Sequence, residues 1–283
     1  MKYQYCGLVL NTSEIFPELE PADNGALPDI QIHEAKLGSI PAIARAYGPN
    51  WVVNKGEAWW WLEGKIYFRI RPGQIEVDNR NAESALARAL LLEAPMIMAM
   101  IFNGIFCLNA ASAIYNGETV VFCGDASSGR STAIARLVLR GGKLLTDSLA
   151  RVDCTRSDGA RVVPQGSGAL LWPHSLELLG LSEDEGTQAR ESSLLRRIKF
   201  AQAQRAGVID EIYWRKPLVG SDASSRAPDG NLGSRKIFSR LAMITAGRIW
   251  ISAAGLSAPH FQWCLKAAQH LNITPAPQRY FDY

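Results

Sequence analysis

The stretch Gly124–Thr132 reads Gly-Asp-Ala-Ser-Ser-Gly-Arg-Ser-Thr, and it decides which fold we expect. It follows the pattern G-x-x-x-x-G-K-[S/T], in which glycines let successive backbone N–H groups converge on a phosphate. The helix that follows points its N-terminus at the same anion. In this pattern the lysine reaches the β- and γ-phosphates, and the serine or threonine hydroxyl holds Mg²⁺. Here Arg130 stands at the lysine position.

The sequence on both sides of the loop provides the context that this motif needs. Thr119–Cys123 is apolar and β-branched, as expected of a buried strand, and residues 131–140 have helical spacing that stops at Gly141-Gly142. Lys143–Thr146 follows as a second strand, and Asp147 ends it, where a carboxylate can meet a Mg²⁺-bound phosphate. The order strand, loop, helix, strand predicts a parallel βαβ unit.

The arginine at position 130 leaves three interpretations open. It keeps the positive charge of lysine, but its planar fork is longer and wider than an ammonium group. The chain could be an active enzyme with an adapted arginine, a nucleotide-binding protein without turnover, or a scaffold that keeps an empty loop. The simplest structural alternative is a Gly/Ser-rich surface loop that merely joins a strand to a helix.

Segments around the loop resemble the C-terminal catalytic domain of HPr kinase/phosphorylase. They are Leu108–Ala113 (Leu-Asn-Ala-Ala-Ser-Ala), the Asn116-Gly117 turn, Arg140–Asp147 (Arg-Gly-Gly-Lys-Leu-Leu-Thr-Asp), and Val163-Pro164 with Leu170–Ser175 (Leu-Leu-Trp-Pro-His-Ser). The chain more closely resembles the HPr-kinase-like proteins of peptide natural-product machinery, such as lasso-peptide kinases, in which a β-rich portion precedes the kinase core. The resemblance is specific over about residues 100–180.

This resemblance implies ATP- and Mg²⁺-dependent phosphorylation of a serine on a peptide or small protein, in peptide natural-product biosynthesis. The aspartate after the second strand, Asp147, would serve as the catalytic base. Ser131 and Asp147 would hold Mg²⁺. The residues expected to bind the ATP phosphates are Gly124, Ser127, Ser128, Gly129, Arg130, Ser131 and Thr132.

Three positions depart from the family pattern, and all three lie around the expected phosphate. Asn109 replaces a histidine, Arg130 replaces the lysine, and Ser148 replaces the second of two adjacent aspartates. Phosphoryl transfer depends on positioning and on charge neutralisation around the γ-phosphate. These departures favour an alternative function, that of a catalytically inactive, pseudokinase-like subunit that binds a peptide or a partner enzyme.

The hydrophobic pattern predicts an α/β protein with two regions. Residues 1–80 are expected to be β-rich, with strands at 51–53, 58–62 and 65–70, a hairpin turn at Glu63-Gly64, and Trp59–Trp61 packed in a small core. Residues 81–283 are expected to form the HPr-kinase-like P-loop domain, a mixed sheet with flanking helices. Helices are expected at 81–100, 235–246 and 260–271, a polar segment of weak helical spacing at 183–206, and a surface loop at 219–235.

Composition excludes several other classes of function. The chain has 283 residues, 47% hydrophobic and 20% charged, with a net charge of only +3 and no long basic run, so no nucleic-acid partner is expected. No two of its five cysteines have metal-site spacing, which suits a reducing cytoplasm. We see no signal peptide, and no apolar run reaches the ~20 residues of a membrane span. Homo-oligomerisation is left open.

Overall fold

The computed structural model describes residues 1–124, 128–189, 194–215, 233–277 and 280. The described residues form a mixed α/β fold with large mixed sheets and flanking helices, as the sequence predicts. The chain divides into two compact units. Unit 1 contains Met1–Phe106 and Gly247–Phe261, and unit 2 contains Cys107–Ala246 and Gln262–Tyr283.

Unit 1 is built on a nine-stranded sheet with the order β3-β1-β2-β4-β9-β8-β7-β6-β5. The predicted hairpin at Glu63-Gly64 is confirmed, because β7 and β8 pair antiparallel with Leu62 opposite Ile66. Trp59 is buried in a cluster with neighbouring side chains, whereas Trp60 and Trp61 are half-buried. The elements are β1 (Lys2–Tyr5), β2 (Leu8–Asn11), β3 (Glu20–Pro21), β4 (Ile30–Glu34), β5 (Ala46–Gly48), β6 (Trp51–Asn54), β7 (Glu57–Leu62), β8 (Ile66–Arg71), β9 (Gln74–Asn79), α1 (Ser84–Leu91), α2 (Ala94–Phe102) and α6 (Arg248–Ala253).

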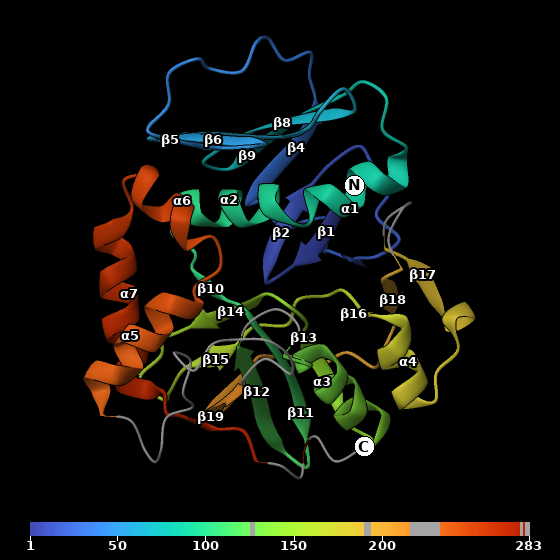
Figure 1. The fold of residues 1–283 in the computed structure, drawn as a ribbon, viewed down its shortest axis with the longest axis vertical. Helices are drawn as coiled ribbons and strands as arrows, with labels where there is room; N and C mark the ends of the chain where they lie inside the picture. The colour runs from blue at the N-terminus through green and yellow to red at the C-terminus, as the bar shows by residue number, and fades with distance from the viewer. Residues whose placement is uncertain (125–127, 190–193, 216–232, 278–279, 281–283) are drawn as a thin grey trace. The chain divides into compact units, whose positions relative to one another are not determined.

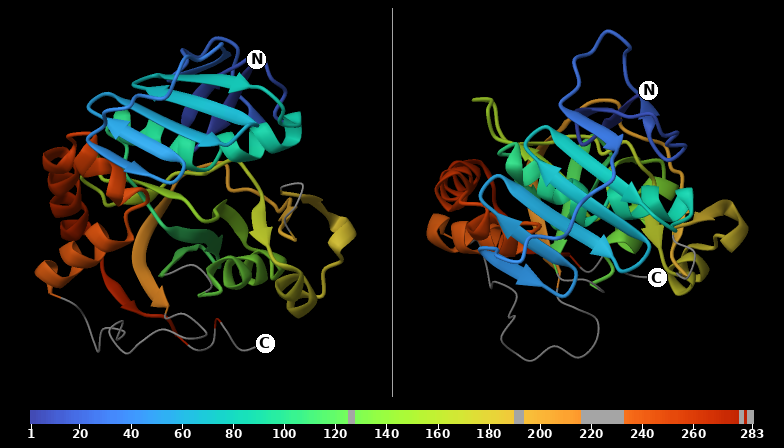
Figure 2. Two further views of the ribbon diagram at one scale, coloured as in Figure 1. Left: turned by 45° about the horizontal axis from the view of Figure 1, so that its top comes forward. Right: turned by 90° about the horizontal axis from the view of Figure 1, so that it is seen from above.

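The helix predicted at 81–100 is two helices, α1 and α2. Glu93 between them has a non-helical backbone, and Pro95 lies in the first turn of α2, where its missing N–H is tolerated. Figures 1 and 2 show both helices along one face of the unit 1 sheet, and α2 contacts β7, β8 and β9. Because α2 packs on the first sheet, the first compact unit continues past the predicted boundary at residue 80 and extends to Phe106.

No single helix in the described part of the chain is long and apolar enough to span a membrane. By length and composition alone, α1 and α2 pass that test only as a pair, bent by 40°.

A buried carboxylate stabilises the unit 1 sheet. Arg69 donates two hydrogen bonds to Glu76, at 2.5 Å from Nε and 2.6 Å from Nη2, and the Glu76 side chain is only 9% exposed. The hydrogen bonds from Arg69 lower the pKa of Glu76 below its usual 4.5, against the opposing effect of burial. Because the native pKa is depressed, this stabilisation is present above pH 4.5 and is lost as the pH falls through the native pKa.

We expect Glu76→Gln to lower the free energy of unfolding by about 1–3 kcal/mol at pH 7, because Arg69 loses a charged, bidentate partner. Urea denaturation at a series of pH values measures this difference. The difference in unfolding free energy should narrow as the pH falls below 4.5 and through the lowered native pKa of Glu76, where the wild-type carboxylate is itself protonated. Glu20→Gln on the exposed strand β3 is the matched control, and an equal loss in both variants would contradict the role of the Arg69–Glu76 pair.

Unit 2 contains an eight-stranded sheet with the path β10-β14-β15-β19-β12-β11-β13, and β20 pairs with β19. A second, three-stranded sheet has the order β16-β18-β17. The elements are β10 (Cys107–Leu108), β11 (Ala110–Tyr115), β12 (Glu118–Gly124), α3 (Arg130–Leu139), β13 (Lys143–Thr146), β14 (Ala150–Asp153), β15 (Arg161–Val162), β16 (Ala169–Leu171), α4 (Pro173–Leu179), a 3₁₀ helix at Glu183–Glu185, β17 (Gly186–Gln188), β18 (Arg196–Ile198), β19 (Gly207–Arg215), α5 (Ser234–Ile244) and β20 (Ile273–Pro275). The helix α7 (Ser257–His270) begins in unit 1 and ends in unit 2.

The predicted unit of strand, helix and parallel strand needs one correction. β11 lies between β12 and β13 and is antiparallel to both, so β12 and β13 run in the same direction without pairing. The parallel partner of β12 is β19. The correction has a simple cause: the Asn116-Gly117 turn joins β11 and β12 as a hairpin, and that hairpin occupies the edge of β12 that β13 would have used.

Alternating side chains of β12 enter two different apolar cores, as a strand covered on both faces requires. Val120 and Phe122 pack with residues of α3, including Ile134. Val121 and Cys123 belong to the other core, with residues of α5, α7 and β19. The central strand is therefore held from both faces, and the position where it ends is fixed.

Downstream predictions had mixed outcomes. The helices expected at 235–246 and 260–271 are α5 and α7, with slightly different bounds. The weak helix expected at 183–206 is wrong for the described part of that segment, which forms the 3₁₀ helix and the strands β17 and β18. Arg196 of β18 pairs with Glu183 of the 3₁₀ helix at 3.1 Å. Most of the loop predicted at 219–235 lies outside the described residues.

Candidate functional site

The ends of several strands meet at one edge of the large unit 2 sheet. β12 ends at Gly124, and its register places Gly124 beside Arg215, the last residue of β19. Thr146 at the end of β13 and Val121 of β12 are both opposite Ser112 of β11. Adjacent strands are ~4.8 Å apart, so Val121 and Thr146 are separated by roughly 10 Å, and β12 continues three residues beyond that level to Gly124. The carboxyl ends of parallel strands are the usual place for a ligand in α/β sheets.

The predicted phosphate loop joins β12 to α3 at this edge. Gly124 has φ +150°, and Gly129, the residue before α3, has φ +78°, values that L-residues with a side chain rarely adopt. No acidic residue lies in the first turn of α3, and among the residues that the structure describes no side chain caps the helix, so its N-terminal dipole is not neutralised from within the helix. Residues 125–127 lie outside the described residues, and the predicted phosphate ligand Ser127 is among them.

Ser128 is described, and its environment is unusual. It is 1% exposed, and within the described ranges its hydroxyl has no hydrogen-bond partner. A buried hydroxyl without a partner is energetically costly, and in a native structure it is often satisfied by a ligand or an ordered water. Its place one residue before Gly129 fits the predicted role in binding phosphate.

Arg130 makes a contact that sequence reasoning did not anticipate. Its Nη1 atom donates a hydrogen bond to the backbone carbonyl oxygen of Asn109. Asn109 is the residue that connects β10 to β11, so the guanidinium group of Arg130 contacts the connection between these two strands. Two of the three positions that depart from the family pattern therefore contact each other, through one guanidinium N–H of Arg130 and the backbone carbonyl of Asn109. A lysine at position 130 would have no guanidinium group.

The two hydroxyl residues that follow Arg130 differ in position. Ser131 is half-buried in the first turn of α3, as a residue that reaches a phosphate-bound metal should be. Thr132 is buried, and its hydroxyl donates a hydrogen bond to Ser175 Oγ of α4 at 2.9 Å. The structure thus places Thr132 in the packing of α3 against α4, while Ser131 stays at the exposed start of the helix.

Asp147 is the predicted catalytic residue, and it is 3% exposed. Its Oδ2 atom accepts a hydrogen bond from the backbone N–H of Leu170 at 2.9 Å and another from the Ser148 hydroxyl at 3.3 Å. Its Oδ1 atom is buried and has no hydrogen-bond partner among the residues that the structure describes. One oxygen is therefore held in place by the protein, and the other has no protein partner among the described residues.

The backbone at Asp147 is fixed by residues that the sequence motif did not include. The Gln165 side-chain oxygen accepts hydrogen bonds from the Asp147 N–H at 2.8 Å and from the Thr146 hydroxyl at 3.1 Å. Ser148, at the position of the family's second aspartate, has φ +67°. Such a backbone is uncommon for serine and is often found at functional sites. No pattern in the sequence pointed to Gln165, because it is far from Asp147 in the chain and belongs to no motif.

His174, in the Leu170–Ser175 segment of the sequence resemblance, is not among the residues of this sheet edge. His174 is an exposed residue at the start of α4, 3.9 Å from Glu177. Among the described residues, no group of three or more His, Cys, Asp and Glu side chains could hold a metal ion. The oxygens available for Mg²⁺ at the sheet edge are the hydroxyl of Ser131 and the free carboxylate oxygen of Asp147. Mg²⁺ often binds through one or two protein oxygens, with phosphate and water completing its shell, so this set fits the ion.

The five cysteines are buried, and none of them forms a disulfide. Burial raises the pKa of the Cys123 thiol to about 12, although it directly precedes the loop. A thiol with such a pKa is protonated at neutral pH and is not a nucleophile. The site therefore offers carboxylate and hydroxyl chemistry, not thiol chemistry.

Comparison with known proteins shows similarity to solved structures but not to family models or curated sequences. No protein-family model matches the sequence, and no curated protein matches it significantly. Among solved structures, the chain is similar to the Hpr(Ser) kinase/phosphatase from Coxiella burnetii, with a TM-score of 0.26 and 14% sequence identity over 44% of this chain and 70% of that one. Similarity at this level carries no argument about function, so the candidate site rests on the geometry of its own residues.

Proposed function

We propose that this chain is a divergent HPr-kinase-like phosphotransferase that binds Mg-ATP at the N-terminus of α3 and phosphorylates a serine of a peptide or small protein. The observation that supports this most strongly is the free Oδ1 of Asp147. A carboxylate that is 3% exposed and has one oxygen without a partner among the described residues is costly to keep, and a bound ligand or ion is a common reason for such an atom in a native structure.

Each residue of the site has a definite part in the proposed reaction. The backbone around Gly129 and the first turn of α3 bind the phosphates, and Ser128 and Ser131 add hydroxyl contacts. Mg²⁺, when bound by Ser131 and Asp147, neutralises charge that develops on the phosphoryl oxygens. Leu170 and Ser148 hold the Oδ2 oxygen, so Oδ1 has one of two parts: it helps to hold Mg²⁺, or it accepts the proton of the substrate serine.

One observation favours the second candidate function, nucleotide or peptide binding without transfer. Arg130 is the only basic residue in the sequence of the loop motif, and its guanidinium group donates a hydrogen bond to the carbonyl of Asn109 between β10 and β11. An arginine held there neutralises less of the charge on a γ-phosphate. In this alternative the site binds a ligand, and the chain assists a partner enzyme.

The decisive experiment combines binding and transfer. The whole protein is incubated with Mg-ATP and the small peptides encoded beside its gene, and each peptide is weighed for added phosphate. Thermal unfolding with and without Mg-ATP is measured in parallel. A ligand at a hundredfold excess over Kd stabilises the folded state by ~2.7 kcal/mol. Stabilisation with a phosphorylated peptide supports the kinase, stabilisation without transfer supports the binding protein, and a melting curve unmoved by millimolar Mg-ATP contradicts both nucleotide functions.

Arg130→Lys tests the meaning of the arginine. We expect the affinity for Mg-ATP to rise about tenfold, equivalent to ~1.4 kcal/mol, because the ammonium group gives up the Asn109 carbonyl and can turn to the phosphates. Isothermal titration calorimetry measures the change. Arg140→Lys, at the exposed C-terminal end of α3, is the matched control and should leave the affinity unchanged. Weaker binding by Arg130→Lys would instead show that the arginine itself contacts the phosphates.

A further inference from the structure

A cavity in unit 1 lies where one strand stops and its neighbour continues. β2 pairs with β4 in parallel only at Leu10–Ile30 and Asn11–Gln31, whereas β4 continues to Glu34 in register with β9. Beyond Gln31, the described residues provide β4 with no strand partner on the β2 side. An unpaired strand edge of this kind is a template for another extended chain.

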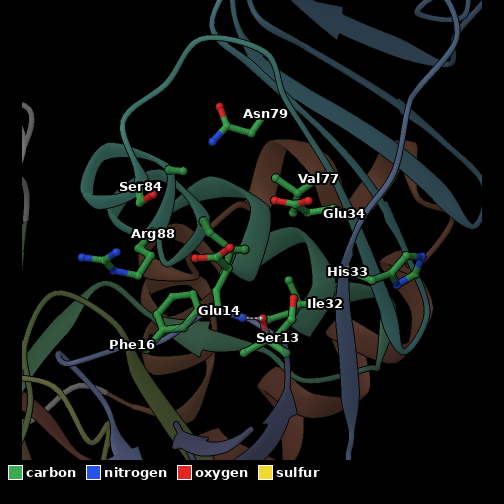
Figure 3. Close-up of a pocket in the computed structure, with 13 residues that line it drawn as sticks. Ser13, Glu14, Phe16, Ile32, His33, Glu34, Val77, Asn79, Ser84 and Arg88 are labelled. Carbon is green, nitrogen blue, oxygen red and sulfur yellow. Dashed lines mark hydrogen bonds between the residues drawn. The ribbon is translucent and has the colours of Figure 1, made fainter.

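The segment that follows β2 turns away from β4 and forms one wall of the cavity. Its backbone finds partners elsewhere: Thr12 N–H bonds to the Met1 carbonyl, and Phe16 N–H bonds to the Tyr3 hydroxyl. The edge of β4 is thus left open by the path of the chain. The cavity is lined by Thr12, Ser13, Glu14, Phe16, Ile32, His33, Glu34, Val77, Asn79, Ser84, Ala87, Arg88 and Leu91 (Figure 3).

The floor of this cavity is apolar. Phe16, Ile32 and Leu91 are buried, with exposures of 2%, 5% and 3%. The cavity has a volume of about 80 Å³, more than twice the ~30 Å³ that one water molecule occupies in the liquid. It is far smaller than the ~300–1,000 Å³ of sites for drug-sized ligands. It therefore suits a single aliphatic side chain and not a nucleotide.

The rim of the cavity carries negative charge. Alternation along β4 puts Ile30, Ile32 and Glu34 on one face; the two isoleucines are buried, but Glu34 is exposed. Glu14 supplies a second exposed carboxylate from the segment after β2, and Figure 3 shows both side chains. Within the described part of the chain, no ion pair involves either glutamate.

The one arginine at the rim does not offset these two charges. Arg88 pairs with Glu18 at 3.4 Å, so its charge is already matched. Figure 3 shows its guanidinium group pointing away from Glu34 and Val77. The rim is therefore complementary to a cation.

We propose that the β4 edge and this cavity bind an extended peptide that carries an aliphatic residue and a lysine or arginine two positions apart. The peptide adds a strand to β4 at Ile32–Glu34 through main-chain hydrogen bonds. Because side chains two residues apart share a face, the aliphatic side chain enters the cavity over Ile32 while the basic one reaches Glu34 and Glu14. This site does not depend on the phosphate site, and its binding requires no nucleotide.

The first test is a selection. A phage-displayed library of random octapeptides is panned against the whole protein, after subtraction on the cavity-filling variant Ala87→Phe. A second blocking variant, Ser84→Trp at the start of α1, serves if Ala87→Phe has lost its native circular dichroism. We expect enrichment of sequences with an aliphatic residue and Lys or Arg two positions apart. Failure to enrich any sequence, or enrichment of sequences without that spacing, would overturn the proposal.

The second test measures the selected peptide by fluorescence anisotropy. The double variant Glu14→Gln/Glu34→Gln should bind at least tenfold more weakly, and the matched control Glu20→Gln should stay within twofold of wild type. N-methylation of the peptide nitrogens that face β4 should also abolish binding, whereas methylation of the alternate nitrogens should not. Equal affinity in the double variant would refute the charged rim. A dimer in sedimentation that Ala87→Phe dissociates would show that the edge binds a second copy of this chain instead.

Discussion

Asp147→Asn is expected to reduce phosphoryl transfer by at least ~10²-fold, within the range that a positioned proton acceptor contributes. The asparagine oxygen can still accept the hydrogen bond from Leu170 N–H, so the local structure should persist. The new amide NH₂ then stands where Oδ1 was free. It can neither accept a proton from serine nor bind a cation, so both proposed parts of Asp147 are lost in a nearly isosteric side chain.

Stability measurements separate this role from a structural one. Removing a buried charge that is only partly satisfied should leave the melting temperature of the ligand-free protein unchanged or raise it. The additional stabilisation by Mg-ATP should shrink in the same variant. Asp184→Asn, at an exposed position of the 3₁₀ helix, is the matched control and should change neither quantity. Full transfer activity in Asp147→Asn would reject Asp147 as the base.

The phosphate-loop corner could be predicted from the sequence because its information is local. A β-branched apolar run predicts β12, the spacing of glycines predicts the turn, and the 3.6-residue period followed by Gly141-Gly142 predicts α3. The structure agrees with the predicted bounds of β12 and α3 to within a residue or two, whereas residues 125–127 of the turn lie outside the described residues. Asp147 also followed from local signals, since it directly ends a short apolar strand.

The parts that sequence reasoning missed depend on contacts between distant segments. The side chain of Gln165 fixes Asp147 from 18 residues away, and Arg130 bonds to Asn109 from 21 residues away. Neither pair leaves a periodic or spacing signal. The strand order failed for the same reason, since the placement of β11 between β12 and β13 is a tertiary pairing. The β-propensity of the sequence also could not predict the cavity of unit 1. That cavity exists because the pairing of β2 with β4 ends at Asn11.

Gly168 is a further residue whose importance only the structure reveals, and it carries the largest stability effect that we expect. It directly precedes β16, where Ala169 pairs with Ile198 of β18. A Cβ atom at Gly168 would lie 2.1 Å from the backbone carbonyl oxygen of Ile198 and 2.9 Å from its carbonyl carbon. Backbone atoms cannot rotate away as a flexible side chain can, so an added methyl group must separate the two strands.

Gly168→Ala should therefore lower the free energy of unfolding by about 3 kcal/mol, the upper part of the range for overpacking. At roughly 2–4 °C per kcal/mol for a protein of this size, the melting temperature should fall by about 6–12 °C. Differential scanning fluorimetry measures the shift. Gly38→Ala is the matched control, because its Cβ would meet no atom within 4 Å, and it should change stability by less than ~0.5 kcal/mol.

The same substitution should also weaken the phosphate site, through the chain that follows Gly168. Leu170 lies two residues further on, and its N–H holds the Asp147 carboxylate at 2.9 Å. If β16 moves away from β18 to admit the methyl group, that N–H moves with it, and the Asp147 Oδ2 atom keeps only the hydrogen bond from the Ser148 hydroxyl. We expect the stabilisation of Gly168→Ala by Mg-ATP to be smaller than that of wild type, even at temperatures where the variant is fully folded. A variant that melts as wild type does, or that retains the full Mg-ATP shift, would show that the two strands yield without disturbing Asp147.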